Sequence, residues 1–228
     1  MMLKRHMLYN YAYGFESSIT KFADSSHKQH IQSTVVKKME CPNSQPIDPR
    51  VKRTRKLLQD AMRELLGEKR FSSISVSDIT DRATVNRATF YAHFEDKQAL
   101  MTSVLKADFE IRLKAQIPDC GAFDQDGMQK IAATVYKFLA EIRSGCPEAA
   151  MELDSMIGNA LQEKIYEMVY YWAKHEGAAG ELKGFSTESI ATAASWTIFG
   201  GAYKWVQGDR KIPADKHSSE LVRLIFRP

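Results

Sequence analysis

Long apolar runs are missing from this sequence of 228 residues. No stretch approaches the roughly eighteen consecutive apolar residues that mark a membrane-spanning helix. The N-terminus carries Lys4 and Arg5 but lacks the apolar run of a secretory signal. We therefore expect a soluble, cytoplasmic protein that does not engage a membrane.

Side chains that bind metals or carry redox chemistry are sparse. The three cysteines, Cys41, Cys120 and Cys146, have an odd count and no metal-site spacing. Buried or incidental thiols are the expected role, with redox sensing as the alternative. The six histidines are scattered, at positions 6, 27, 30, 93, 175 and 217. No metal and no cofactor is expected.

Motifs of catalysis and patterns of strands are also absent. The sequence offers no G-x-S-x-G, no Walker loop and no H-E-x-x-H, so we do not expect an enzyme. No alternating apolar pattern of useful length predicts a strand. Periodicity and helix-stop residues instead predict an all-α fold. Helices are expected over residues 50–66, from 75, and over 87–94, 96–117, 128–143, 147–157, 160–175, 187–206 and 214–226.

Residues 75–97, SVSDITDRATVNRATFYAHFEDK, predict two short helices joined by a tight turn. Ser75 and Asp78 form an S-x-x-D capping box that opens the first helix. Asn86 is a good N-cap for the second helix, because its side-chain oxygen can accept a free amide hydrogen. This pattern is typical of a helix-turn-helix.

The second helix has an apolar face and a polar, aromatic face. Phe90 and Phe94 anchor it at spacing i, i+4. In a helix-turn-helix, the N-terminal residues of the second helix point toward base edges in the major groove. The side chains placed in this way are Arg87, Ala88, Thr89 and Tyr91.

Residues 83–100, ATVNRATFYAHFEDKQAL, resemble the TetR family of transcriptional regulators. The usual family pattern is A-G-V-S-x-x-T-F/L-Y-x-H/Y-F-x-x-K-x-x-L, and Tyr, His, Phe and Lys fall here at its offsets. Thr84 departs from the pattern, since the family often has glycine there. A β-branched residue at positive φ costs ~1–2 kcal/mol, so we expect a differently shaped turn.

The resemblance implies a domain plan and a function. A three-helix helix-turn-helix DNA-binding domain is expected over residues 48–95, followed by a helical ligand-binding and dimerisation domain over 96–228. The implied protein is a dimeric repressor that binds a palindromic operator of double-stranded DNA and is released by a small-molecule effector. Two alternatives stay open: a body that binds a protein partner instead of a small ligand, and an activator.

The expected DNA contacts follow from this reading. Arg87 is assigned to a base edge, preferably guanine, and Thr89 and Tyr91 to bases or adjacent phosphates. His93 and Lys97 are expected on the DNA backbone, and the alternative for His93 is packing against the first helix. Ser75 is expected to offer its hydroxyl and its helix N-terminus to a phosphate. The full set of expected DNA-binding residues is Arg53, Ser75, Asn86, Arg87, Ala88, Thr89, Tyr91, His93 and Lys97.

Positive charge is concentrated in the same region. Residues 49–94 contain ten Lys or Arg against five Asp or Glu, a net charge of +5, while the whole chain carries only +4. The leading run, residues 50–56, lies at the start of the first predicted helix. A solvated face is the usual reading of such a run by itself, but beside this motif we favour steering toward phosphates.

The helices that follow are rich in small and aromatic residues. The last two are expected to form the dimer contact. Gly200 and Gly201 are expected to allow close packing of helices or to kink their helix, and the alternative is that they end it early. Contact within one subunit is the alternative. The expected effector pocket, with ordinary core as the alternative for each residue, consists of Tyr136, Met156, Tyr166, Tyr170, Trp172 and Trp196.

Residues 1–47 fit no domain. They show no sustained periodicity and end in a turn-rich linker, so we expect a disordered extension. Met39 lies about ten residues before the basic run. Translation is expected to start at Met39, and the alternative is a basic arm that touches DNA.

Overall fold

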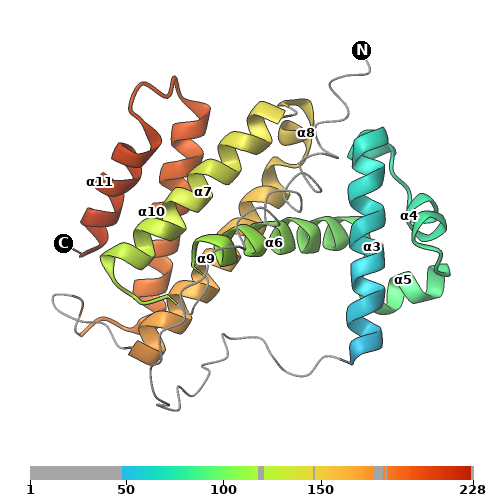
Figure 1. Ribbon diagram of the computed structural model, residues 1–228, viewed down its shortest axis with the longest axis horizontal. Coiled ribbons are helices and arrows are strands. Elements are labelled where there is room, and N and C mark those ends of the chain that lie inside the picture. Colours follow the sequence, from blue (N-terminus) through green and yellow to red (C-terminus); the bar gives the residue numbers. More distant parts are fainter. Residues whose placement is uncertain (1–47, 118–120, 146, 177–181, 183, 227–228) are drawn as a thin grey trace, which may run out of the picture.

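The computed structural model describes residues 48–117, 121–145, 147–176, 182 and 184–226 (Figure 1). The predictions for residues 1–47, including the start at Met39, and for the three cysteines concern residues outside these ranges. The regular elements are α3 (Pro49–Glu68), the 3₁₀ turn η1 (Phe71–Ser73), α4 (Val76–Ala83), α5 (Arg87–His93), α6 (Lys97–Gln116), α7 (Gln125–Gly145), α8 (Pro147–Glu152), α9 (Asp154–Glu176), α10 (Thr187–Gln207) and α11 (Ala214–Phe226). The predicted all-α fold is confirmed.

The helices α3, α4 and α5 make up the predicted DNA-binding unit and lie at one end of the molecule (Figure 1). Its core contains side chains with no exposed surface, those of Leu58, Met62, Ile79 and Phe90. Burying such side chains stabilises a small unit by about 1.5–3 kcal/mol each. The periodic apolar residues of the sequence therefore converge on one core.

Local capping fixes where these helices begin. The Ser75 hydroxyl oxygen accepts from the Asp78 amide at 3.1 Å, and the Asp78 carboxylate accepts from the Ser75 amide at 2.7 Å. Asn86 accepts from the Thr89 amide at 2.7 Å. The predicted capping box and N-cap are confirmed.

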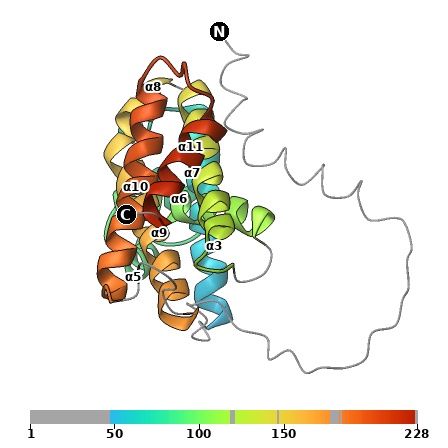
Figure 2. The ribbon, with the colours of Figure 1, turned by 90° about the vertical axis from the view of Figure 1, so that its left-hand side faces the viewer.

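The body comprises α7 to α11, and α6 leads into it from the DNA-binding unit (Figure 1). In the body, α10 packs against α9, α7 and α11. Seen from the side in Figure 2, α10 and α11 lie next to each other on the face turned away from the DNA-binding unit. None of the described helices is long and apolar enough to cross a membrane.

Two glycines in the body serve close packing between helices. The sequence predicts separate helices over residues 147–157 and 160–175, but Gly158 lies inside α9. The interruption between α8 and α9 comes earlier, at Leu153. A Cβ at Gly158 would lie 3.3 Å from the Phe199 ring of α10. A Cβ at Gly201 would collide with Leu221 of α11. Because α10 continues to Gln207, Gly201 does not end the helix.

The turn between α4 and α5 contains a left-handed residue. Thr84 has φ 56° and ψ 44° and follows α4 directly. Its amide donates to the Asp81 carbonyl at 3.3 Å, and the Val85 amide donates to the Thr80 carbonyl at 3.0 Å. The expectation of a differently shaped turn was wrong. The chain keeps the conformation in which glycine is favoured and places a β-branched residue there.

Replacing Thr84 with glycine should therefore stabilise the protein. Relief of the strain, ~1–2 kcal/mol, outweighs the entropic cost of glycine, about 0.5–1 kcal/mol, so Thr84→Gly should raise the free energy of unfolding by about 0.5–1 kcal/mol. Urea unfolding measures this change. The control is Ala92→Gly at an exposed position within α5, which should lower stability by ~1 kcal/mol. Equal destabilisation by both variants would show that Thr84 is not strained.

Candidate nucleic-acid interface

The helix α5 is the second helix of the predicted helix-turn-helix, and we call it the recognition helix. One face of it is packed against the protein and the other is open. Phe90 is fully buried and Phe94 is nearly so. The side chains of Thr89 and His93 are half-buried. The exposed side chains of α5 and its N-cap are those of Asn86, Arg87, Ala88, Tyr91 and Ala92. Most of the predicted base-reading residues thus lie on the open face.

Asn86 and Thr89 are joined by two hydrogen bonds. The Asn86 side-chain oxygen accepts both the Thr89 amide, at 2.7 Å, and the Thr89 hydroxyl, at 2.9 Å. The hydroxyl proton of Thr89 is therefore used within the protein. The lone pairs of its oxygen and the side-chain NH₂ of Asn86 are the groups suited to DNA.

Arg87 and Tyr91 form a second pair on the exposed face. Nη2 of Arg87 donates to the Tyr91 hydroxyl oxygen at 3.2 Å. The guanidinium carbon lies 5.6 Å from the centroid of the Tyr91 ring, within cation–π range. Tyr91 nevertheless keeps 48% of its surface exposed.

The first turns of α3 carry the basic run beside α5. Lys52, Arg53 and Lys56 are exposed. Arg55 differs, because its Nη1 donates to the His93 carbonyl at 3.2 Å and its guanidinium carbon lies 4.4 Å from the Phe94 ring centroid. Arg55 therefore fastens α3 to the end of α5. Sequence reasoning missed this role, since nothing in the basic run distinguishes Arg55 from its neighbours.

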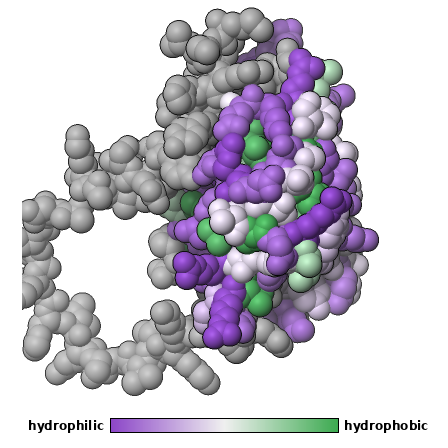
Figure 3. Space-filling view, turned by 90° about the vertical axis from the view of Figure 1, so that its right-hand side faces the viewer, coloured by the Kyte–Doolittle hydropathy of each residue, from purple (hydrophilic) through white to green (hydrophobic). Residues whose placement is uncertain are grey.

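Figure 3 views the molecule from the side on which α3, α4 and α5 lie in Figure 1. The surface on this side is largely hydrophilic, with small apolar patches. Not all of its positive charge is open to a partner. Arg82 of α4 forms ion pairs with Glu64, at 3.2 Å, and with Glu68, at 2.9 Å. Charge that could meet phosphates is therefore contributed chiefly by the exposed start of α3 and by Arg87.

Ser75 was predicted to offer the N-terminus of α4 to a phosphate. In the structure the Asp78 carboxylate occupies the N-terminus of α4. The Ser75 hydroxyl donates to it at 2.7 Å, and the Lys69 ammonium lies 2.8 Å from the same carboxyl oxygen. The Lys69 ammonium, and then the Ser75 hydroxyl, hold the pKa of the Asp78 carboxyl well below its usual value. An ionised carboxylate repels phosphate, so this geometry does not support Ser75 as a phosphate contact.

Lys97 was predicted to contact the DNA backbone, but the structure gives it an internal role. Its ammonium donates to the carbonyls of Phe71 at 3.0 Å, Ser72 at 3.2 Å and Ile74 at 2.7 Å. It also lies 4.7 Å from the Phe71 ring centroid. An ammonium has three N–H donors, and all three are used here. Lys97 thereby ties the start of α6 to η1.

Removing the Lys97 ammonium should cost stability rather than change the salt dependence of DNA binding. Lys97→Met removes one donor from each of three carbonyls and should lower the free energy of unfolding by about 1–3 kcal/mol. The matched control, Lys52→Met on the exposed start of α3, should change stability by less than about 0.5 kcal/mol and reduce the slope of log affinity against log salt by roughly one. Urea unfolding and salt-titrated DNA binding measure both. If Lys97→Met is as stable as wild type and its slope of log affinity against log salt is reduced, Lys97 does contact a phosphate.

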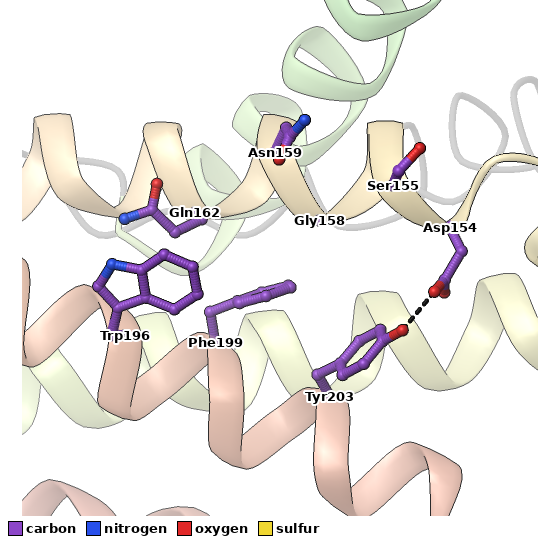
Figure 4. Close-up of a pocket in the computed structure, with 8 residues that line it drawn as sticks. All are labelled: Asp154, Ser155, Gly158, Asn159, Gln162, Trp196, Phe199 and Tyr203. Carbon is purple, nitrogen blue, oxygen red and sulfur yellow. Dashed lines mark hydrogen bonds between the residues drawn. The ribbon is translucent and has the colours of Figure 1, made fainter.

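A groove in the body lies between α9 and α10 (Figure 4). Its volume is about 230 Å³. The Tyr203 hydroxyl donates to the Asp154 carboxylate, which also forms an ion pair with Arg143 at 3.0 Å. The bond to Asp154 raises the pKa of the Tyr203 hydroxyl. The lining residues are Asp154, Ser155, Gly158, Asn159, Gln162, Trp196, Phe199 and Tyr203.

The six predicted pocket residues do not all line this groove; of them, Trp196 does. Tyr136 is buried, its hydroxyl lies 2.5 Å from His217 Nδ1, and burial raises its pKa. Trp172 is buried as well. Tyr166 and Tyr170 stack on each other along α9 with ring centroids 5.9 Å apart. The sixth, Met156, is half-buried and packs against the core. For Tyr136 and Trp172, core packing is therefore the role that the structure supports.

The sequence profile of the family described as "Bacterial regulatory proteins, tetR family" matches residues 58–104. An HTH-type transcriptional regulator of Bacillus subtilis (strain 168), YxbF, is 43% identical over 61 residues, which make up 26% of this chain and 16% of that protein. The dhaKLM operon transcriptional activator DhaS of Lactococcus lactis subsp. lactis (strain IL1403) is 34% identical over 56 residues, 25% of this chain and 30% of that protein. The chain thus matches less than a third of the length of either relative.

Two solved structures are similar at low sequence identity. Dihydroxyacetone kinase operon activator DhaS has a TM-score of 0.45 and 18% identity, over 76% of this chain and 94% of that one. The transcriptional regulator FadR from Bacillus subtilis, in complex with stearoyl-CoA, has a TM-score of 0.44 and 17% identity, over 75% of this chain and 97% of that one. The match to the family therefore rests on the sequence of residues 58–104.

Proposed function

Because the chain belongs to the TetR family of bacterial regulatory proteins through residues 58–104, we propose that it is a homodimeric transcriptional repressor that binds an operator in double-stranded DNA. The observation that carries this proposal is the recognition helix α5, which is capped at its start and packed on one side, with Arg87, Ala88 and Tyr91 exposed on the other. The family is one of regulators and not of enzymes.

The DNA contacts that we propose divide into two kinds. Arg87 reads a guanine, because a guanidinium can donate to both O6 and N7 in the major groove. Asn86, Ala88 and Thr89 lie at neighbouring base edges, and Tyr91 and His93 lie at the sugar–phosphate backbone. Arg53, with Lys52 and Lys56, meets phosphates on the same side, since exposed basic side chains supply affinity without sequence preference.

A homodimer through α10 and α11 follows from the need to read two half-sites, which lie ~34 Å apart. The proposal is supported by apolar side chains on the outer faces of these helices: Trp196 is 56% exposed and Leu224 is 64% exposed. A Cβ at Gly200 would meet nothing within 4 Å, so this side of α10 is open to another helix. The contact of Gly201 with Leu221 belongs to a different face, within one subunit.

Release by a small molecule requires that a change in the body reach the DNA-binding unit. Besides the bonds from Lys97 to η1, two junctions between described residues join these parts. Between α3 and α6, Arg63 pairs with Asp108 at 2.7 Å and Gln59 donates to the Ser103 hydroxyl at 2.8 Å. At the second junction, the Ser72 amide of η1 donates to the Glu152 carboxylate of α8 at 2.5 Å. We propose that an effector in the body moves α6 or α8 and so changes the separation of the two recognition helices.

Activation is the second candidate output, because one matched relative, DhaS of Lactococcus lactis, is an activator. A protein partner in place of a small effector is the other open alternative for the body. A thermal-shift screen of small apolar and cationic compounds separates these cases. A hit that also releases the operator supports an effector, whereas hits that leave DNA binding unchanged contradict it.

The proposed function is tested with duplexes selected from a randomised DNA library by the full chain. Arg87→Ala should lose about 1–3 kcal/mol of binding to the selected site and relax discrimination at one base pair. Arg53→Ala is the control, and it should weaken binding to all duplexes alike and flatten the salt dependence. If the wild-type chain enriches no sequence, the protein is not a sequence-specific regulator of this kind.

The second junction makes a separate prediction. Glu152→Ala should weaken binding to the selected duplex by up to about tenfold, because a bond to a charged group worth ~1.5 kcal/mol no longer restrains the DNA-binding unit. Glu167→Ala, whose carboxylate pairs with Lys164 within α9, is the matched control and should bind as wild type. Hydrogen exchange at the Ser72 amide should quicken in Glu152→Ala alone. Unchanged exchange and unchanged affinity would remove this junction from the mechanism.

A further inference from the structure

We infer that Tyr91 is a positioning residue that determines specificity: its phenol holds the Arg87 guanidinium for base reading and links that reading to a phosphate contact. This inference rests on the proposed function and deepens it. It assigns the two side chains to one recognition unit, whereas each taken alone would be a separate DNA contact. The Tyr91 ring contacts both Phe90 and the Arg87 guanidinium.

The Tyr91 ring is held from the protein side. Phe90, the neighbouring residue, has no exposed surface and meets the Tyr91 ring edge-on, with centroids 5.3 Å apart and an angle of 87° between the rings. Phe90 in turn packs against Phe94, with centroids 6.2 Å apart. An edge-to-face contact with a buried ring restricts an exposed side chain. Tyr91 is therefore an exposed residue with a supported orientation.

Arg87 lies one helical turn before Tyr91, where side chains at i and i+4 meet. The phenol contacts the guanidinium in two ways, by accepting a hydrogen bond from Nη2 at 3.2 Å and by placing its ring 5.6 Å from the guanidinium carbon. A guanidinium has five N–H donors. One is used by Tyr91, and the four that remain exceed the two that a guanine requires.

The neutrality of this partner matters for DNA binding. Arg82 lies in the same unit, but its charge is balanced by two carboxylates, those of Glu64 and Glu68. The phenol of Tyr91 orients Arg87 without an opposing charge. Arg87 therefore keeps its full attraction for DNA while it loses rotational freedom, and this combination favours selective binding.

The Tyr91 hydroxyl can make a second hydrogen bond, as a donor. Its oxygen accepts from Arg87, and its own O–H proton stays available to a further acceptor. The acceptor that lies beside a helix in the major groove is a phosphate oxygen. A phosphate bound at Tyr91 would polarise the hydroxyl and strengthen its bond to Arg87. A chain of hydrogen bonds then links a phosphate, Tyr91, Arg87 and the base. Arg87 is held for base recognition only when the DNA backbone places a phosphate at Tyr91.

Tyr91→Phe tests this unit, because it keeps the ring and removes only the exposed hydroxyl. The experiment compares full-length wild type, Tyr91→Phe, Arg87→Ala and the double variant on the selected duplex and on all single-base variants of it. We expect Tyr91→Phe to reduce discrimination at the base pair read by Arg87 by about three- to tenfold. In the double variant, Tyr91→Phe should remove no further discrimination beyond that lost in Arg87→Ala. Tyr171→Phe in α9 is the control and should leave binding unchanged.

Three results would overturn the inference. Tyr91→Phe that weakens all duplexes equally would make Tyr91 a plain phosphate contact. Losses of discrimination that add in the double variant would make the two residues independent readers. A lowered melting temperature for Tyr91→Phe, with discrimination intact, would make the hydroxyl structural. In each case wild type still selects its duplex, so the proposed function stands. Failure of wild type to select any duplex would overturn the function itself and this inference with it.

Discussion

The ammonium group of Lys97 holds the junction on which the orientation of the DNA-binding unit depends. It binds three carbonyls of one turn, those of Phe71, Ser72 and Ile74, from the first residue of α6. That turn leads directly into the capping box of α4. The Ser72 amide of the same turn donates to the Glu152 carboxylate of the body. One short turn is therefore hydrogen-bonded to both α6 and α8, so a movement of either helix displaces it.

The recognition helix is short, so its order comes from its surroundings. Asn86 closes its start, Phe90 anchors its buried face, and Arg55 holds the His93 carbonyl and the Phe94 ring at its end. An isolated helix of this length is not stable in water. These contacts leave the exposed face free of structural duties, apart from the pairing of Arg87 with Tyr91. A face of this kind can vary in sequence without loss of the fold.

Several features were predictable because their causes are local. The caps at Ser75 and Asn86 depend on residues within three positions, and the apolar spacing that buries Phe90 repeats within one helix. The break at Leu153 was not predictable in this way. Gly158 is a common stop signal in sequence, but here it makes room for Phe199 of another helix. Thr84 is likewise left-handed, and it lies between the buried Ala83 and Val85, whose side chain packs against the core.

The sequence by itself determined the fold class, the helix-turn-helix, its caps and which side chains of α5 are exposed, since short-range hydrogen bonding and periodic burial decide these. Only the tertiary structure decided which charges remain available to DNA. Lys97 and Arg55 bind carbonyl oxygens, Arg82 binds carboxylates, and the exposed basic residues at the start of α3 do not differ from them in type. A side chain's partner depends on residues far away in the chain, so a list of basic residues does not separate structural cations from those that meet phosphate.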